Sequence, residues 1–373
     1  MEKEQDPVQA ASRTRAAIHL LHPQQLQDSL ALAPQLSLRI ALIAGLQASL
    51  AVLAALVLTL LSPWPELVGF PALGALAALF GRFAPLARRR RMVAVCALLL
   101  LAAVLLPSLA SLLGASPWQL VLVLALVAGA STVAVSRWDL GGPGAVIIVF
   151  AAGAALHPVG TSQELAARLV ATAAGGLLAW VVCWLTDGLR ARELRQLQFP
   201  AVRIPPMSHQ WIAGARIAAG AAIAALLAWA AGAQHPAWAA IGATAVMQGS
   251  HLHVTMNRAL QRLAGTVIGA CLVWLLLAQQ PPLWAIVLAV IVFQFLTEVI
   301  IGFNYALGQI TVTPMALLMT LLASQSSLAG QMPVERVLDT LLGAAVGIAL
   351  AVLFSSADDR AYLAQLRRKP GAR

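Results

Sequence analysis

Apolar residues along this chain gather into long runs that are separated by short polar connections. A helix needs about 20 apolar residues to cross a bilayer. Three runs are shorter than this and predict half-length or broken helices: Gly69–Phe83, Gly144–Leu156 and Pro236–Gln248. The others reach or approach the full length: Ile40–Leu61, Met92–Leu113, Trp118–Val135, Leu165–Leu185, Trp211–Ala233, Ala259–Ala278, Leu283–Ile301, Tyr305–Ala323 and Val334–Phe354. The pattern predicts an all-α polytopic membrane protein with about twelve transmembrane helices.

The two halves of the pattern resemble each other segment by segment. GFPALGALAALFG pairs with HPAWAAIGATAVM, SPWQLVLVLALV pairs with PPLWAIVLAVIV, and ARLVATAAGGLL pairs with ERVLDTLLGAAV. An even number of spans in each half predicts two parallel six-helix repeats, related by an axis along the membrane normal and arranged around a central cleft. We expect the first repeat at 39–186 and the second at 211–355. The remaining segments are a cytoplasmic N-terminal segment at 1–38, a basic linker at 187–210 and a basic tail at 356–373.

Composition and charge place the chain in a membrane. Only 10% of the residues are charged and the mean hydropathy is +0.84, whereas soluble proteins carry about 25% charged residues. The net charge of +10 comes from basic residues in the connections, which indicates membrane orientation rather than nucleic-acid binding. An even count of spans puts the Arg88–Arg91 cluster and the Arg190–Arg203 group on one side, so we expect both termini in the cytoplasm. The N-terminal segment lacks a secretory signal and predicts a short amphipathic helix around Ala16–Ala33.

One spacing of polar and small residues returns three times, each time at the start of a long apolar run. An arginine is followed by threonine four residues on and by glycine seven residues on: Arg168, Thr172 and Gly175; Arg262, Thr266 and Gly269; Arg336, Thr340 and Gly343. The three positions share one helix face. Glycine lets a neighbouring helix approach closely and threonine supplies a hydroxyl, while a cation near a helix N-terminus is expected to seek an anion. Alternatively, the arginines reach the lipid headgroups or pair with nearby carboxylates such as Glu164 and Glu335.

The segments HPAWAAIGATAVMQG, NRALQRLAGTVIGA and ERVLDTLLGAAVG together resemble the fusaric acid resistance and aromatic acid exporter family of bacterial inner-membrane proteins. The resemblance is most specific over His235–Val346 and includes the motifs at Arg262 and Arg336. It implies an inner-membrane location and efflux of aromatic carboxylic acids and related toxic compounds, and it is compatible with a periplasmic adaptor protein and a homo-oligomer. More distant relatives include plant malate channels. Longer members carry sizeable cytoplasmic regions after each membrane half, where this chain has a short linker and a short tail.

Ionisable residues inside a bilayer are costly and are therefore candidates for function. Glu298 and Asp339 lie inside or near the ends of predicted spans, and we consider both for proton coupling. Glu298 is either a proton carrier or a residue at the cytoplasmic interface. Asp339 follows Arg336 by three residues on the same helix face, which favours a structural ion pair over a proton relay.

Other polar and aromatic residues lie at the ends of the predicted spans. Gln248, Asn257 and Arg258 flank the central connection and either line a cytoplasmic vestibule or are solvated loop residues. His251 and His253 lie in the same loop without a third ligand in sequence, so we expect no metal site. An interface position is expected for His235, and an aromatic belt at the membrane boundary is expected for Trp64, Trp118, Trp238 and Trp284.

The sequence offers no motif for catalysis or for a cofactor. A Walker nucleotide loop needs a lysine after glycine, and the only lysines are Lys3 and Lys369. The three cysteines sit in apolar runs without disulfide or metal spacing. We therefore expect a secondary transporter, not an enzyme, that exports small organic anions, is driven by protons through Glu298, and uses Arg262 and Arg336 near opposite membrane faces. The alternatives are a passive anion channel and a non-transporting membrane component that anchors partners.

Overall fold

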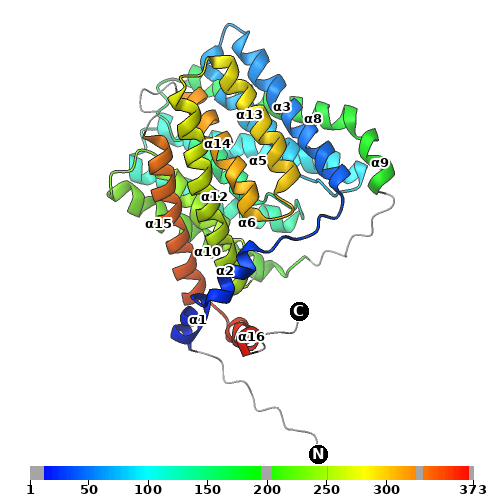
Figure 1. Ribbon diagram of the computed structural model, residues 1–373. Coiled ribbons are helices and arrows are strands. Elements are labelled where there is room, and N and C mark those ends of the chain that lie inside the picture. The colour runs from blue at the N-terminus through cyan, green and yellow to red at the C-terminus, as the bar shows by residue number, and fades with distance from the viewer. Residues whose placement is uncertain (1–11, 195–203, 250, 325–330, 369–373) are drawn as a thin grey trace, which may run out of the picture.

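The computed structural model describes residues 12–194, 204–249, 251–324 and 331–368, and the regular structure in these ranges is helical (Figure 1). Within them, nine helices are long and apolar enough to cross a membrane. They are α3 (Leu38–Leu60), α5 (Leu86–Leu112), α6 (Pro117–Arg137), α8 (Ser162–Thr186), α10 (Met207–Ala230), α12 (Leu252–Ala278), α13 (Leu283–Ile300), α14 (Tyr305–Ser324) and α15 (Met332–Leu353). The predicted all-α polytopic membrane fold is therefore confirmed, whereas the total of twelve spans in two repeats stays a prediction.

Shorter apolar helices take the places of the three short runs. They are α4 (Gly69–Ala75), which continues as the 3-10 helix η2 (Leu76–Leu79), α7 (Ala145–Ala154) and α11 (Ala237–Met247). Nearly every residue of α4 and α11 is buried in protein. Backbone that ends at membrane depth is tolerated where protein or water covers it. Burial thus explains how these helices are stable although each is shorter than the bilayer is thick.

Helices at equivalent places in the two halves pack against equivalent partners. In the first half α4 packs on α8, and in the second half α11 packs on α15. Similarly, α5 contacts α8 and α12 contacts α15. Across the halves, α3 packs on α13 and α6 packs on α10. A two-fold repeat would give this pattern, so the packing supports the predicted repeat.

The glycines of the recurring motif lie where two helix backbones meet. A Cβ atom added at Gly175 would overlap the carbonyl oxygen of Pro71 on α4. One added at Gly343 would overlap the carbonyl oxygen of Ala239 on α11, and one at Gly269 would lie 2.8 Å from a carbonyl oxygen of α14. Each motif glycine therefore lies at a point where a neighbouring helix passes too close to leave room for a side chain, as small residues do between helices in lipid.

Replacing Gly343 by alanine is expected to push α11 away from α15. The added methyl group has no room against the Ala239 backbone, and overpacking of this kind costs about 1–3 kcal/mol. Thermal unfolding of the purified protein in detergent measures the loss. Gly188→Ala at the start of α9 (Gly188–Leu194) is the control, because nothing lies within 4 Å of a Cβ atom there. An equal loss in both variants would contradict the close approach of α11 and α15.

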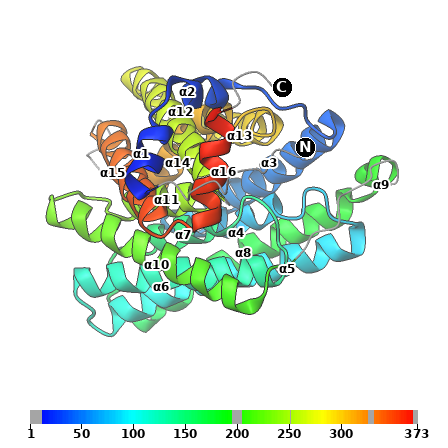
Figure 2. The ribbon, with the colours of Figure 1, turned by 90° about the horizontal axis from the view of Figure 1, so that it is seen from below.

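Three short helices gather at one end of the bundle: α1 (Arg13–Leu20), α2 (Pro23–Leu30) and α16 (Ala357–Arg368) (Figure 2). The predicted single helix around Ala16–Ala33 is wrong, because Pro23 begins a new helix. Proline fits the first turn of a helix but not its interior, and His22 caps this turn by accepting the Gln24 N–H (3.2 Å). Other parts of the predicted N-terminal segment, linker and tail, at 1–11, 195–203 and 369–373, lie outside the described residues.

Candidate functional site

Two arginines of the recurring motif, Arg262 on α12 and Arg336 on α15, are buried in the second half, and each is only 2% exposed. Arg262 Nη1 donates to the Tyr305 hydroxyl (3.1 Å) and to Gln309 Oε1 (3.4 Å). The Arg336 guanidinium lies over the ring of Trp238, 5.3 Å from its centroid. The positive charges of the two arginines repel each other. The two charges are therefore near enough to interact, whereas the sequence places them near opposite membrane faces.

The start of α12 explains this proximity. The helix begins at Leu252, several residues before the predicted apolar run, so Arg262 lies about three turns inside it. Asn257 and Arg258 are also on α12 and not in a loop. Arg258 lies 5.9 Å from the ring centroid of Tyr305, beside the Arg262 site. Asn257 instead accepts a hydrogen bond from a side-chain amide of α2 (2.5 Å).

In the described part of the chain, neither buried arginine has a carboxylate oxygen within 4.0 Å of its side-chain nitrogens. Arg262 Nε, Arg336 Nε and Arg336 Nη1 are also buried without a hydrogen-bond partner there. Asp339 attracts Arg336, but the expected ion pair does not form, because the Arg336 side chain lies over Trp238 of α11 instead. A buried charge without a partner is costly, by several kcal/mol. The arrangement would therefore be stabilised by an anion.

Four threonine hydroxyls on the helices around the two arginines also lack a partner among the described residues. They belong to Thr244 on α11, Thr266 on α12, Thr313 on α14 and Thr340 on α15. These helices adjoin one another, since α12 packs against α11, α14 and α15. Asp339 is buried as well, and its Oδ2 atom has no partner among them. Buried polar atoms normally have a hydrogen-bond partner, so this part of the second half is polar and incompletely satisfied.

In the first half, the charge of the motif arginine, Arg168, is neutralised by a carboxylate on the same helix. Arg168 donates to Glu164 Oε1 (2.6 Å) and to two carbonyl oxygens of the preceding loop, at 3.0 and 2.8 Å. The Thr172 hydroxyl donates to the Arg168 carbonyl oxygen (2.8 Å). The residue four positions before Arg336 is Met332, so the second half lacks the glutamate that Arg168 uses. The two halves therefore place the same motif in different electrostatic surroundings.

His235 and Glu335 tie the start of α11 to the start of α15. His235 Nδ1 lies 2.8 Å from Glu335 Oε2, and the backbone N–H of His235 donates to Oε1 (2.7 Å). Glu335 is thus engaged by His235 rather than by Arg336. The His235 ring stacks on Trp238, with centroids 4.3 Å apart, and Trp238 is buried. The prediction that Trp238 belongs to an exposed aromatic belt is therefore wrong; the other predicted belt residues are exposed, namely Trp64, Trp118 and Trp284.

Gln248, a predicted vestibule residue, joins the two halves. Its side chain lies against Gly144 at the start of α7. When its amide oxygen points toward that helix, it accepts from the backbone N–H groups of Ala145 and Val146, both at 3.1 Å. These are donors that the first turn of a helix leaves without an intrahelical acceptor. Gln248 therefore acts as a cap for α7.

Glu298 lies at a contact between the two halves of the chain. Its Oε2 atom is 4.0 Å from Arg82 Nη1, and Arg82 Nη2 also donates to Gln35 Oε1 (3.1 Å). Burial lowers the pKa of Arg82, and the Glu298 charge opposes this effect. Of the two carboxylates considered for proton coupling, Glu298 thus has a cationic neighbour at ion-pair distance, whereas Asp339 has none among the described residues.

Asp187 binds a second group of arginines, which the sequence indicated only as basic clusters on one side of the membrane. It pairs with Arg89 (3.3 Å), Arg90 (3.1 Å) and Arg190 (3.8 Å). Arg89, Arg190 and Asp187 are almost fully buried. Burial, together with the Arg89 charge, lowers the pKa of Arg190 to about 9. Asp187 directly follows the end of α8. Polar residues are common at helix ends, so the sequence alone gives no sign of its role, which only its three arginine partners reveal.

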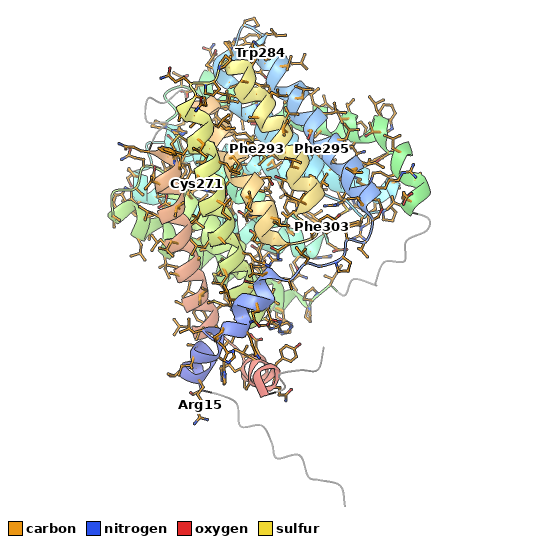
Figure 3. All side chains as sticks on the ribbon, in the orientation of Figure 1. Arg15, Cys271, Trp284, Phe293, Phe295 and Phe303 are labelled. Atoms are coloured by element: carbon orange, nitrogen blue, oxygen red, sulfur yellow. The ribbon has the colours of Figure 1, made fainter. Side chains whose placement is uncertain are left out.

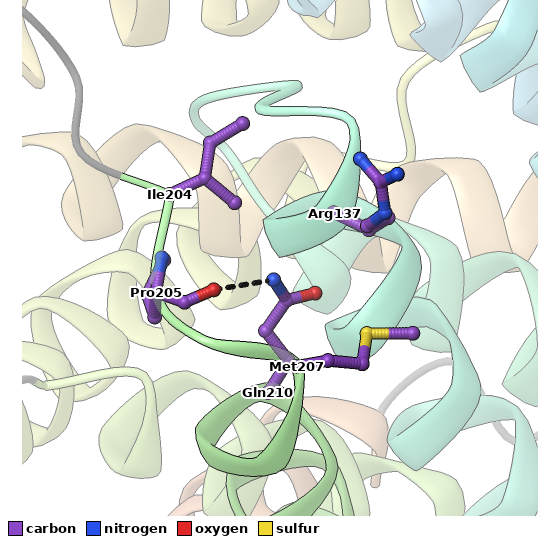
Figure 4. Close-up of a pocket in the computed structure, with 5 residues that line it drawn as sticks. All are labelled: Arg137, Ile204, Pro205, Met207 and Gln210. Atoms are coloured by element: carbon purple, nitrogen blue, oxygen red, sulfur yellow. Dashed lines mark hydrogen bonds between the residues drawn. The ribbon is translucent and has the colours of Figure 1, made fainter.

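A pocket at the surface lies apart from these groups. It is lined by Arg137, Ile204, Pro205, Met207 and Gln210, where α6 ends and α10 begins (Figure 4). Gln210 Nε2 donates to the Pro205 carbonyl oxygen (2.8 Å). The predicted site residues are not among those that line this pocket, so we assign it no part in the site.

Comparison with known proteins relates the second half of the chain to a protein family. Residues 222–350 match the family described as fusaric acid resistance protein-like. Over 111 residues the chain is 35% identical to the uncharacterized membrane protein YvaC of Bacillus subtilis (strain 168), a match that covers 30% of this chain and 18% of YvaC. No solved structure matches the chain significantly. The matched range contains both buried arginines and the helices around them, and the family resemblance of the second half is thereby confirmed.

Proposed function

We propose that this multi-pass membrane protein, whose residues 222–350 match the fusaric acid resistance protein-like family, is a transporter that exports small organic anions. The observation that carries the proposal is the pair of buried arginines, Arg262 and Arg336, without an ion-pair partner among the described residues. A buried charge without a countercharge is expensive in a membrane protein and typical of a substrate or ion pathway. A bound carboxylate would supply the missing countercharge.

The chemistry of the site suits a carboxylate. Guanidinium groups bind carboxylates through charge-assisted hydrogen bonds, and Nε and Nη1 of Arg336 are buried without a partner among the described residues. The hydroxyls of Thr266 and Thr340 add neutral donors. Trp238 and Tyr305 place aromatic rings beside the arginines. Together with the family match, these features support aromatic carboxylic acids and related compounds as the substrate class.

We further propose a bacterial inner-membrane location with both termini in the cytoplasm. The membrane potential there is negative inside, so it drives an anion outward by about 2.3 kcal/mol per charge for 100 mV. Coupling to protons needs a group that takes up and releases a proton, and Asp339 fits this role better than Glu298 does, since Glu298 already lies at ion-pair distance from Arg82. A periplasmic adaptor and a homo-oligomer stay predictions from the resemblance.

Transport in proteoliposomes tests the proposal. The flux of a radiolabelled hydroxybenzoate is measured with purified protein, with and without an imposed pH gradient and with and without an imposed membrane potential. An organic-anion transporter gives saturable flux that exceeds that of protein-free vesicles. Flux that follows voltage without saturating would favour a passive channel. The absence of flux from folded protein under any gradient would contradict the proposal that the protein transports organic anions of this class.

Asp339→Asn is expected to abolish the effect of a pH gradient on this flux, while Glu298→Gln is expected to preserve it. Asparagine keeps the shape of the side chain but cannot exchange a proton, and Asp339 lies next to Arg336 in the proposed site. The readout is the ratio of flux with the gradient to flux without it, in each variant. If only Glu298→Gln loses the effect, the proton carrier is Glu298, as the sequence had suggested.

A further inference from the structure

Helix α2 has an inverted polarity. Its two buried residues are polar, with Gln25 1% and Ser29 3% exposed, whereas Leu26 is 56% and Leu30 is 68% exposed. A helix at the surface of a soluble protein turns its apolar stripe toward the core and its polar residues outward. The opposite arrangement is favourable where the surroundings are apolar. The outer face of α2 therefore suits lipid rather than water.

The connection from α2 to α3 continues this arrangement. Leu32 and Leu36 are both exposed. Meanwhile, the backbone and polar side chains of the connection bind the bundle: Ala33 N–H donates to the Phe303 carbonyl oxygen (2.7 Å), and Gln35 Nε2 donates to the carbonyl oxygen of Val299. We call residues 23–36 the leucine belt. Along the whole belt, polar contacts face the protein and leucines face outward.

Contacts with the bundle place the leucine belt at the boundary of the membrane. The Ser29 carbonyl oxygen accepts from Gln261 Nε2 (2.7 Å) and from Asn304 Nδ2 (2.9 Å). Gln261 is on α12, about 26 Å of helix before its far end, which is close to the roughly 30 Å thickness of the hydrocarbon core. The Phe303 carbonyl oxygen accepts a hydrogen bond from the belt. Figure 3 shows that Phe303 follows the last turn of α13, whereas Trp284 lies at the other end of this helix.

We infer that the leucine belt lies in the membrane interface on the side of the chain termini, with Leu26, Leu30, Leu32 and Leu36 inserted among lipid acyl chains. Helices that lie in the interface bury their apolar face at the boundary between headgroups and acyl chains. The belt begins with α2, which packs against the N-terminal part of α12. It then leads into α3 (Figure 1). Lipid thus covers one side of the belt while hydrogen bonds from α12 and from the connection before α14 hold the other side.

Fluorescence quenching on the full-length protein tests the position of Leu30. The background variant is Cys271→Ser, because Cys271 is exposed while Cys96 and Cys183 are buried. Leu30→Cys is labelled with a polarity-sensitive fluorophore in vesicles of phosphatidylethanolamine and phosphatidylglycerol. We expect emission at shorter wavelength than in water, strong quenching by lipids that carry a nitroxide near the top of the acyl chain, and weak quenching by iodide.

Gln27→Cys is the matched control, because Gln27 is an exposed polar residue on the same helix. Its label is expected to emit at longer wavelength and to be quenched by iodide. Equal iodide quenching at Leu30 and Gln27 would overturn the inference, and so would protection of Leu30 from both quenchers, which would mean that protein covers it. Leu32→Cys repeats the measurement in case Leu30→Cys does not fold. These readouts do not depend on transport, so they stand whether or not the proposed substrate class is correct.

Discussion

Arg336→Leu is expected to abolish transport of organic anions while the protein stays folded. Arg336 has no ion-pair partner and two unpaired N–H positions among the described residues, so the protein itself loses little when the charge is removed. A bound carboxylate would lose its main countercharge. Truncating one side of a buried charge pair costs about 2–5 kcal/mol, which corresponds to roughly a 30- to 4,000-fold loss of affinity. Flux and substrate binding in proteoliposomes measure the loss.

Arg168→Leu is the matched comparison for this prediction, since it removes the same residue of the same motif. Arg168 is paired with Glu164 and two backbone carbonyl groups, so its loss is expected to lower the unfolding temperature and the yield. The folded fraction should still bind substrate with the affinity of the wild type. Arg336→Leu should show the reverse, with unchanged or improved stability. Wild-type transport by Arg336→Leu would exclude Arg336 from the substrate site.

Asp187→Asn is expected to cause the largest loss of stability among single substitutions of charged residues considered for this chain. Asp187 is the common partner of Arg89, Arg90 and Arg190, and two of these arginines are almost fully buried. Asparagine would leave their charges uncompensated, and breaking a buried pair in this way costs about 3–5 kcal/mol. The midpoint of thermal or chemical unfolding in detergent measures the change.

The control for Asp187→Asn is Asp139→Asn. Asp139 pairs with Arg88, which is half exposed, and an ion pair at the surface contributes about 0–1 kcal/mol. Its replacement should therefore have little effect. The two pairs differ chiefly in burial, so similar losses in both variants would show that burial does not set the strength of the Asp187 cluster.

The membrane helices were predictable because lipid imposes a simple rule on the sequence. A span needs an uninterrupted apolar run of a set length, and each predicted run coincides with a helix, the short runs that became α4, α7 and α11 included. The motif glycines were also predictable, since small residues at helical spacing indicate close backbone contact. Gly175, Gly269 and Gly343 all lie at such contacts.

The pairing of Arg168 with Glu164 was predictable from their spacing on one helix, but the other partners of the charged residues were not, because they depend on how distant helices meet. Arg168 and Arg336 share a motif and each has a glutamate nearby in sequence, yet Arg168 pairs with Glu164 while Glu335 pairs with His235. Trp238 stands at the start of an apolar run, as a boundary residue does, but α11 is enclosed by other helices and so is Trp238. Local spacing does not reveal which helices are enclosed.

In the proposed transport, the shortness of α11 would also affect the electric field that the anion experiences. Its 11 residues span about 16 Å, roughly half of the hydrocarbon thickness. Where water reaches both ends of such a short helix, the membrane voltage falls over that distance alone. The same potential then produces a field about twice as steep as across an unbroken bilayer, and an anion passing α11 gains most of the electrical work of crossing within that stretch.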